Sequence, residues 1–302
     1  MSRLRIFLCI LVISTFIFLT GIPVVLASGA DAANAGMKAL SQGDRKKAKV
    51  LFQSALKSNE LTKKNYIIVN NELCKLFWSE SNMAQAINCF SESLYLNLDD
   101  SLARFSRGVL YKDIGEYKRA IKDFSKYIVL APRDDRGYIY RGLSHQVLKD
   151  NDRAISDFSQ AISLRPGNGA GYVHRGNTFY ETGNYNLALA DFEKAVVVDP
   201  NSSSANQALA WFYATCPNGD FRHGAKAVGL AEKALGADKK DRPGTILLET
   251  LAAAYAESGQ FEQAIETQEQ ALALIIESKV DSAGDIRLRL DLYTRGTPYR
   301  ME

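Results

Sequence analysis

The chain has 302 residues, 24% of them charged, and a formal net charge of +3 at pH 7. Its 37 Lys and Arg nearly balance 34 Asp and Glu without forming a charge run. The sequence therefore lacks the basic stripe that binding to nucleic acid requires. Removal of Arg3 and Arg5 with an N-terminal segment would lower the net charge to +1.

Residues 1–27 have the three parts of a secretory signal peptide: a basic start, an apolar run from Ile6, and a short final region. Val25 and Ala27 suit the small-residue positions before a cleavage site. We therefore predict an exported protein, periplasmic or extracellular. The alternative is an uncleaved membrane anchor, because the 22 residues 6–27 are long enough to cross a bilayer.

The stretches 101–134, 135–168 and 169–202 superimpose without a gap on a period of 34 residues. They share Gly at position 8, Ala at position 20, Phe at position 24 and Pro at position 32, namely Gly108, Gly142, Gly176, Ala120, Ala154, Ala188, Phe124, Phe158, Phe192, Pro132, Pro166 and Pro200. Glycine inside a helix costs about 1 kcal/mol relative to alanine. We therefore expect a larger residue at position 8 to clash, and the small residues at positions 8 and 20 to face each other. Proline at position 32 ends the second helix.

This spacing resembles the tetratricopeptide repeat, a helix pair that buries its apolar face only by stacking on its neighbours. The resemblance implies an all-α, right-handed superhelical solenoid of about seven helix-turn-helix repeats. The repeats are expected at 29–62, 67–100, 101–134, 135–168, 169–202, 203–244 and 245–278. Four inserted residues follow the first of them. A loop from Thr215 to Gly224 delays the second helix of the sixth, and three extra residues around Lys239–Pro243 precede the seventh.

Residues 279–302 are predicted to form a C-terminal capping helix and a tail. Asp281 and Ser282 offer a helix cap, and apolar residues then recur at i, i+4 and i+7, namely Ile286, Leu290 and Tyr293. A solenoid exposes apolar surface at its last repeat, so a helix of this kind covers it. The stop signals at 295–298 end the helix.

Arginine at position 7 and aspartate at position 23 occur together in the three regular repeats and in no other repeat. The pairs are Arg107 with Asp123, Arg141 with Asp157, and Arg175 with Asp191. Because the two residues co-occur, we expect them to pair between helices, either within a repeat or across a repeat boundary. We assign these pairs a structural role, holding the helices in register.

Cleavage of the signal peptide would leave three cysteines, Cys74, Cys89 and Cys216. Cys74 and Cys89 lie on the two helices of one repeat, so a disulfide between them is one interpretation. Two buried free thiols at small-residue positions explain the pair equally well. Cys216, in the loop of the sixth repeat, has no assigned role.

The sequence contains no catalytic constellation. The three histidines, His145, His174 and His223, have no Cys or carboxylate at metal-ligand spacing, and there is no phosphate loop or nucleophile elbow. We therefore expect no cofactor, no metal site and no enzymatic activity. An enzyme that uses the loop 215–224 is the weakest hypothesis, because its Pro-Asn-Gly is turn chemistry.

In proteins that this chain resembles, positions 2, 5, 9 and 12 of each first helix line a concave groove. The corresponding residues here are mostly apolar or aromatic: Leu102, Phe105, Val109, Ile139, Leu143, Val173, Asn177, Tyr180 and Trp211. Side chains of this kind suit a peptide or helix of a partner protein. Alternatively, several of them pack against neighbouring first helices.

Our leading hypothesis is a noncatalytic scaffold that binds a segment of another protein of the cell envelope in this groove. A carrier of a small apolar ligand or lipid is the alternative. The segments 209–217, 251–257 and 298–300 are similar to a C-terminal part common in bacterial repeat proteins, which favours a bacterial envelope protein. The identity of the partner and the oligomeric state do not follow from the sequence.

Overall fold

The computed structural model describes residues 28–238, 244–278 and 283–301. Within these ranges the chain consists of α-helices and one short 3-10 helix, without a strand, so the predicted all-α architecture is confirmed. The Cα packing divides the chain into two compact units, residues 1–98 and 99–302. The predicted signal peptide, the extra residues at Lys239–Pro243 and the cap residues Asp281 and Ser282 lie outside the described residues.

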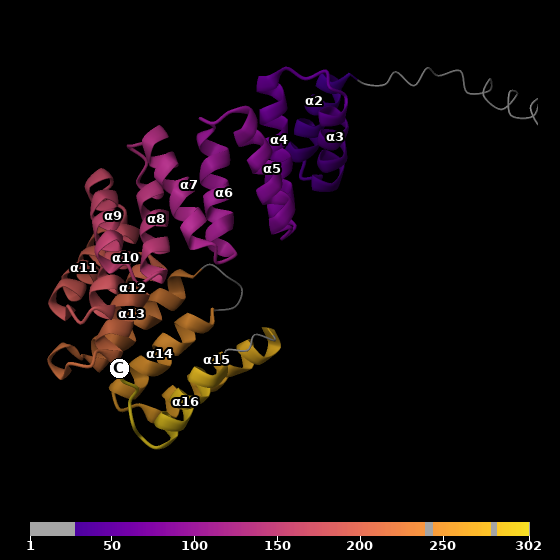
Figure 1. The fold of residues 1–302 in the computed structure, drawn as a ribbon. Helices are drawn as coiled ribbons and strands as arrows, with labels where there is room; N and C mark the ends of the chain where they lie inside the picture. Colours follow the sequence, from indigo (N-terminus) through magenta and orange to yellow (C-terminus); the bar gives the residue numbers. More distant parts are fainter. Residues whose placement is uncertain (1–27, 239–243, 279–282, 302) are drawn as a thin grey trace, which may run out of the picture. The chain divides into compact units, whose positions relative to one another are not determined.

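The first unit contains two helix pairs (Figure 1). Its helices are α2 (Gly29–Ser41), α3 (Arg45–Lys57), α4 (Lys63–Ser79) and α5 (Met83–Leu96). Helix α4 has 17 residues, whereas α2 has 13. The side chain of Thr62 caps α4 by accepting a hydrogen bond from the backbone N–H of Asn65 at 3.3 Å. The four residues predicted as an insertion are therefore an added first turn of α4, and the expected start at 67 lies inside this helix.

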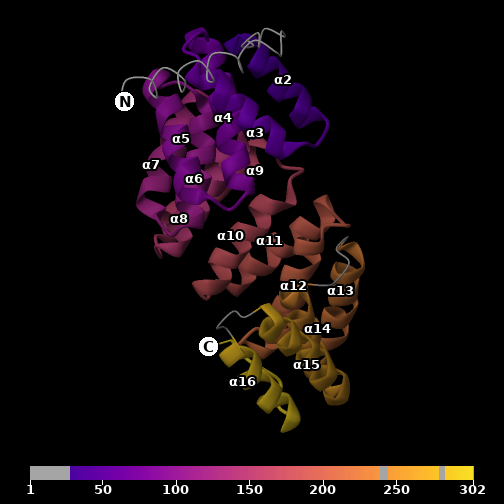
Figure 2. The ribbon, with the colours of Figure 1, turned by 90° about the vertical axis from the view of Figure 1, so that its right-hand side faces the viewer.

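The second unit contains five further helix pairs and one final helix. The helices are α6 (Ser101–Asp113), α7 (Tyr117–Leu130), α8 (Asp135–Val147), α9 (Asn151–Leu164), α10 (Gly169–Glu181), α11 (Tyr185–Val198), α12 (Ser203–Thr215), α13 (Gly224–Ala237), α14 (Thr245–Glu257), α15 (Phe261–Ser278) and α16 (Ala283–Thr294). Each second helix packs on its own first helix and on the first helix of the next repeat, and α6 to α12 thereby form a stack of pairs. Helices α14, α15 and α16 lie side by side at the C-terminal end of this unit (Figure 2).

In the regular repeats, the start of the first helix and the end of the second helix follow from local sequence signals. The residue at position 34 caps the next first helix, its side chain accepting a backbone N–H; these residues are Asp100, Asp134, Asn168 and Ser202. The second helices α7, α9 and α11 end two residues before the prolines at position 32. The turns between the regular repeats are thus determined by one cap and one proline each.

The glycines at position 8 allow a phenylalanine of the facing helix to come close. A Cβ atom on Gly142 would lie 2.7 Å from Cε1 of Phe158, and one on Gly176 would lie 2.8 Å from Cε1 of Phe192. A larger residue therefore clashes, as predicted. The facing group, however, is the Phe at position 24 and not the Ala at position 20. The ring fills the space that the missing side chain leaves, which gives the interior its close packing.

In every repeat but the sixth, position 15, between the two helices, has a left-handed backbone. Glycine occupies it at Gly43, Gly115, Gly183 and Gly259, with φ between 76° and 81°. Two repeats carry other residues in the same conformation, Lys149 with φ 60° and Ser81 with φ 59°. Only glycine adopts this conformation without steric cost.

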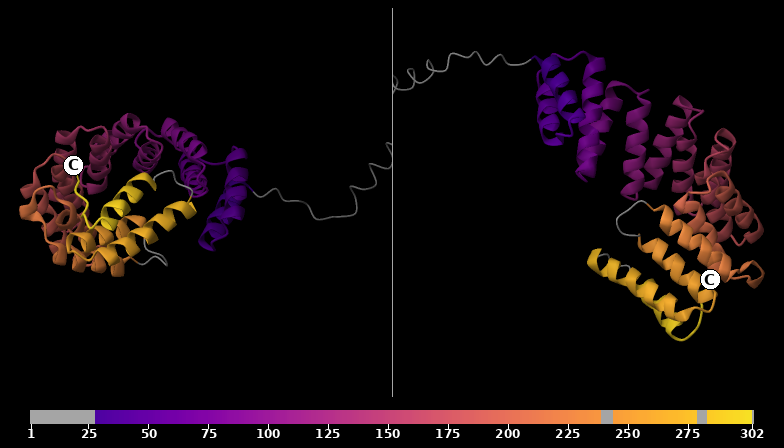
Figure 3. Two further views of the ribbon diagram at one scale, coloured as in Figure 1. Left: turned by 90° about the horizontal axis from the view of Figure 1, so that it is seen from below. Right: turned by 180° about the vertical axis from the view of Figure 1, so that it is seen from behind.

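The predicted capping helix is present as α16. Its buried side chains include Ile286, which is 2% exposed, and Tyr293, which is fully buried. After Gly296 the chain turns back, and the C-terminus lies beside the orange helices (Figure 3), where the backbone N–H of Met301 donates to the carbonyl oxygen of Thr215 at the end of α12. In the part of the chain that the structure describes, no helix is both long enough and apolar enough to cross a membrane.

Candidate functional site

The predicted Arg and Asp pairs join the two helices of each regular repeat. Arg141 donates from Nε to Oδ2 of Asp157 at 2.9 Å and from Nη2 to Oδ1 at 2.7 Å. Arg175 and Asp191 repeat this bidentate contact at 2.8 Å for both bonds, as do Arg107 and Asp123. Of the two arrangements considered above, pairing within a repeat is the one observed.

Two of these arginines, Arg141 and Arg175, also reach the preceding repeat. Nη1 of Arg141 donates to Oγ of Ser125 at 3.2 Å, and Nη1 of Arg175 donates to Oγ of Ser159 at 3.0 Å. The hydrogen bonds to Asp157 are the main cause that raises the pKa of Arg141 above its usual value. The guanidinium groups of Arg141 and Arg175 therefore each contact three helices, which supports the structural role assigned to these pairs.

A disulfide links the two helices of the second repeat. Cys74 on α4 and Cys89 on α5 are bonded, with their Cα atoms 5.4 Å apart. Cys89 stands at position 23, where the regular repeats carry the aspartate of the pair. The disulfide interpretation of these cysteines is therefore the one that the structure supports, and it provides a covalent link where the middle repeats have an ionic one.

The nine predicted groove residues lie on the first helices in three different environments. Leu102 is 44% exposed. Four residues are partly exposed, namely Phe105, Leu143, Asn177 and Trp211, and four are at most 7% exposed, namely Val109, Ile139, Val173 and Tyr180. The buried four pack within the stack and present little surface to a partner. The accessible part of the predicted groove is therefore the face made by Leu102, Phe105, Leu143 and Asn177, which we call the first-helix face.

Phe105 stands at the centre of an aromatic cluster on this face. Its ring centroid lies 4.9 Å from that of Tyr127 and 5.2 Å from that of Tyr140. The guanidinium carbon of Arg136 lies 5.2 Å from the centre of the same ring. The ring of Phe105 is therefore packed against other side chains of the same protein, and the cation of Arg136 lies over its aromatic face.

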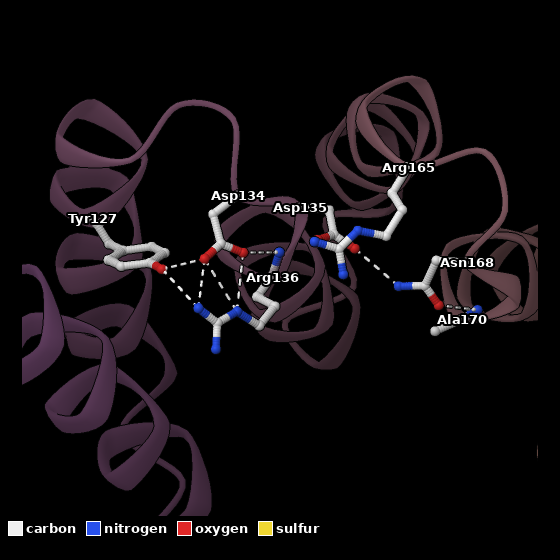
Figure 4. A network of polar contacts seen from close by, with 7 residues as sticks. All are labelled: Tyr127, Asp134, Asp135, Arg136, Arg165, Asn168 and Ala170. Atoms are coloured by element: carbon white, nitrogen blue, oxygen red, sulfur yellow. Dashed lines mark hydrogen bonds and ion pairs between the residues drawn. The ribbon is translucent and has the colours of Figure 1, made fainter.

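A polar network beside Phe105 was not predicted from the sequence (Figure 4). Asp134 accepts hydrogen bonds from the Tyr127 hydroxyl at 2.6 Å and from Nη2 of Arg136, also at 2.6 Å. The Arg136 guanidinium holds the pKa of Asp134 well below its usual range, while burial and Asp134 raise the pKa of Tyr127 to about 12. Arg136 occupies position 2 of its repeat, which is the signal that could have pointed to it.

The next turn repeats this arrangement with different residues. Asp135 is 1% exposed, and its Oδ2 accepts a hydrogen bond from Nδ2 of Asn168 at 2.9 Å (Figure 4). Its Oδ1 lies 3.2 Å from Nη2 of Arg165. Asn168 in turn caps α10 through the backbone N–H of Ala170. The polar groups at the start of α8 and α10 are therefore held in place by contacts within the protein.

Three parts of the chain match sequence models of the tetratricopeptide repeat: residues 103–134, 141–216 and 248–279. These parts coincide with stacked helix pairs in the structure. The chain belongs to the tetratricopeptide repeat family.

Solved structures show the same fold. A tetratricopeptide repeat protein from Parabacteroides merdae ATCC 43184 matches with a TM-score of 0.69 and 16% identity, over 88% of this chain and 98% of that one. MamA from Desulfovibrio magneticus RS-1, residues 41 to the end, matches with a TM-score of 0.53 and 17% identity, over 57% of this chain and 95% of that one. No curated protein matches the chain in sequence. Proteins with this repeat are in general noncatalytic scaffolds for protein–protein interaction, and a protein partner follows for this one.

In this tetratricopeptide repeat protein, Trp211 is covered by the C-terminal part of its own chain. The centroid of its ring system lies 6.1 Å from that of Tyr299. The guanidinium carbon of Arg289 lies 5.9 Å from the Trp211 ring. Trp211 was predicted to line the groove, with packing against a neighbouring first helix as the alternative. In the structure its ring packs on the tail, which returns to α12 after α16, and it stays partly exposed.

The loop between α12 and α13 does not assemble its polar residues into a reactive group. The Cys216 side chain is fully buried, and burial raises the pKa of its thiol. A nucleophilic cysteine needs a lowered pKa and access to solvent. Arg222 donates from Nη1 to the carbonyl oxygens of Cys216 and Pro217, both at 3.0 Å, and from Nε to Oε1 of Glu257 at 3.2 Å. The loop is thus a connector that the hydrogen bonds of Arg222 hold in place.

The histidines lie apart from one another. His174 stacks on Phe158, with ring centroids 5.5 Å apart, and burial lowers its pKa to about 4. His145 is 7% exposed and lies 3.4 Å from Asp150, while His223 packs its ring edge on Tyr213. Among the residues that the structure describes, no three His, Cys, Asp or Glu side chains are grouped as metal ligands.

Proposed function

We propose that this protein is a noncatalytic scaffold of the cell envelope that binds a segment of a partner protein on the first-helix face. Two neighbouring apolar side chains on the first helix α6 carry the proposal, and the first of them, Leu102, is 44% exposed. Phe105, one turn further along α6, is partly exposed and rigidly backed by Tyr127 and Tyr140. An aromatic anchor whose conformation is already held loses little entropy on binding.

The disulfide supports a location outside the cytoplasm. Structural disulfides persist in oxidising compartments and are rare where thiols are kept reduced. Cys74 and Cys89 form such a bond between two helices of the first unit. The three-part segment at 1–27 is the matching feature in the sequence. We propose cleavage after Ala27, and intact-mass analysis of protein from its native cell should then give a product that begins at Ser28.

A photo-crosslinking amino acid at position 102 tests the binding face. In cells, we expect a protein crosslink from this position and none from Val129, which is 75% exposed on the second helix α7. Leu102→Glu should remove the partner from a crosslinker placed at Leu143, whereas Val129→Glu should leave it. Both substitutions are at exposed sites, so circular dichroism should show unchanged folding.

Two results would contradict the proposed binding face. Equal crosslinking from positions 102 and 129, or a Leu102→Glu variant that keeps its partner, would show that the first-helix face is not the binding site. Recovery of lipid in place of protein from the purified native material would favour the carrier hypothesis.

A further inference from the structure

The tail, residues 297–301, binds along the C-terminal ends of two first helices. The backbone N–H of Met301 donates to the carbonyl oxygen of Thr215 at 3.2 Å. Nη1 of Arg300 donates to the carbonyl oxygen of Ala214 at 3.4 Å, and its Nη2 lies 2.6 Å from Oε2 of Glu257. Arg300 therefore places a positive charge where α12 and α14 end, and both the unpaired carbonyls and the helix dipole favour a cation there.

Tyr299 fills the adjacent apolar site. Its ring lies beside Trp211, and the guanidinium carbon of Arg289 lies 5.3 Å from its centre. The Tyr299 side chain packs on a buried cluster that includes Ala252 and Ala256 of α14. Small residues on α14 thus provide the room that an aromatic side chain occupies.

Met301 makes the third contact, packing on the buried cluster around Phe212. Beyond it lies a hollow of about 400 Å³, lined by Met301, Tyr180, Tyr185, Glu181 and Lys149 among others. A segment longer than the tail would have space to continue past the position of Met301. The tail as described, up to Met301, therefore borders this hollow without filling it.

The groups that hold the tail keep other partners when the tail is absent. Glu257 is still bound by Arg222 at 3.2 Å, so it would not become an unpaired buried carboxylate. Arg289 is still paired with Glu249 and still lies over Trp211. Loss of the tail would expose Trp211 without leaving a buried charge alone, which is the costly outcome in such sites. The site is thus complete without its occupant.

We propose that this tail site, made by Trp211, Glu257, Arg289 and the last carbonyls of α12, is a peptide-binding site that the tail fills in the free protein. Its ligand is an extended segment of a partner protein with an aromatic residue, an arginine and an aliphatic residue in succession. Tyr299, Arg300 and Met301 occupy the corresponding positions. The proposal rests on the scaffold role proposed above but uses residues separate from the first-helix face. A partner segment of this chemistry displaces the tail, and Gly296, with φ 66°, provides the pivot.

The test uses a fluorescently labelled peptide of residues 296–302 and three forms of the chain. These are the full chain, the chain ending at Gly296, and the full chain with Tyr299→Ala and Arg300→Ala. Anisotropy should show saturable binding to both altered chains. Binding to the full chain should be at least about tenfold weaker, because its own tail keeps most molecules occupied. A peptide with Tyr299→Ser and Arg300→Glu is the matched control and should not bind.

Two outcomes would overturn the proposal. If the altered chains keep their helical signal and bind no peptide at millimolar concentration, the tail is not a displaceable ligand. If both altered chains lose their helical signal, the tail is a structural cap. In either case crosslinking from position 102 is unaffected, so failure of the tail site and failure of the first-helix face can be told apart.

Discussion

Arg141 and Asp157 join the two helices of one repeat through two parallel hydrogen bonds, at 2.9 and 2.7 Å. The Asp157 side chain is only 8% exposed, so Arg141→Leu leaves a nearly buried carboxylate without its partner. We expect a loss of about 2 kcal/mol in the free energy of unfolding. This lies below the 3–5 kcal/mol of fully buried pairs because the Arg141 side chain is 24% exposed. Urea unfolding followed by circular dichroism measures the change.

The double variant Arg141→Leu with Asp157→Leu is the control for this pair. It removes both charges, so it should be more stable than the single variant, in which the charge of Asp157 has lost its partner. An unchanged urea midpoint for the single variant would show that the pair does not hold the helices in register.

Reduction of the Cys74–Cys89 disulfide should destabilise the first unit. The bond closes a loop with a sequence separation of 15 residues, and constraining such a loop in the unfolded chain is worth about 3 kcal/mol. Thermal unfolding in the presence of a thiol reductant should therefore begin at a lower temperature. The variant with Cys74→Ala and Cys89→Ala should show the lower value with or without reductant. A wild-type melting curve that reductant does not shift would contradict the bond.

The helix pairs could be predicted because the residues that hold the two helices together lie within a single repeat. Gly142 and Phe158 fit one into the other within a single repeat, and the 16-residue spacing of Arg141 and Asp157 brings them together across the same two helices. Cys74 and Cys89 have a similar spacing of 15, so the repeat frame also pointed to their contact, although it could not choose between a disulfide and two thiols.

The binding surface was harder to predict because exposure depends on neighbours that the repeat frame does not specify. Phe105 is covered on one side by Tyr140 of the next repeat, while Ile139, at the equivalent position 5, is buried. Trp211 is covered by Tyr299, 88 residues further along the chain, and no periodicity encodes that contact. The added turn of α4 was missed for a related reason, since a helix can lengthen without disturbing the frame that follows it.

Replacement of Lys149 by glycine should stabilise the protein. Lys149 has a left-handed backbone with φ 60°, and the equivalent residue in the next repeat is Gly183. Relief of the steric cost outweighs the greater freedom of glycine in the unfolded chain, so we expect a gain of about 0.5–1 kcal/mol. The weak ion pair with Glu181 is lost, but the Lys149 side chain is 76% exposed and the pair is worth little.

Lys122→Gly is the matched control for this substitution. Lys122 is exposed in the interior of α7, where glycine costs about 1 kcal/mol. The two variants should thus shift the urea midpoint in opposite directions. A Lys149→Gly variant that is less stable than the wild type would show that the left-handed residue carries no strain.

His174 should make the protein less stable in mild acid. Burial against Phe158 lowers its pKa to about 4 in the folded state, compared with 6.5 for an unperturbed histidine. Well above pH 6.5 the imidazole is neutral in both states, so its titration does not affect the free energy of unfolding. As the pH falls toward 4, the unfolded chain takes up a proton before the folded one does, so the free energy of unfolding decreases.

His174→Tyr isolates this effect, because the preceding repeat has Tyr140 at the same position, 5.7 Å from the ring of Phe124. The difference in urea midpoint between the wild type and the variant should be constant well above pH 6.5 and should change as the pH falls toward 4. This change approaches about 1.4 kcal/mol for each unit by which the pKa is lowered, once the pH is below the folded-state pKa. Burial also lowers the pKa of His145, so the variant should keep part of the pH dependence. If the difference between the two proteins is the same at both pH values, His174 does not titrate in this range, and its stack on Phe158 acts only by packing.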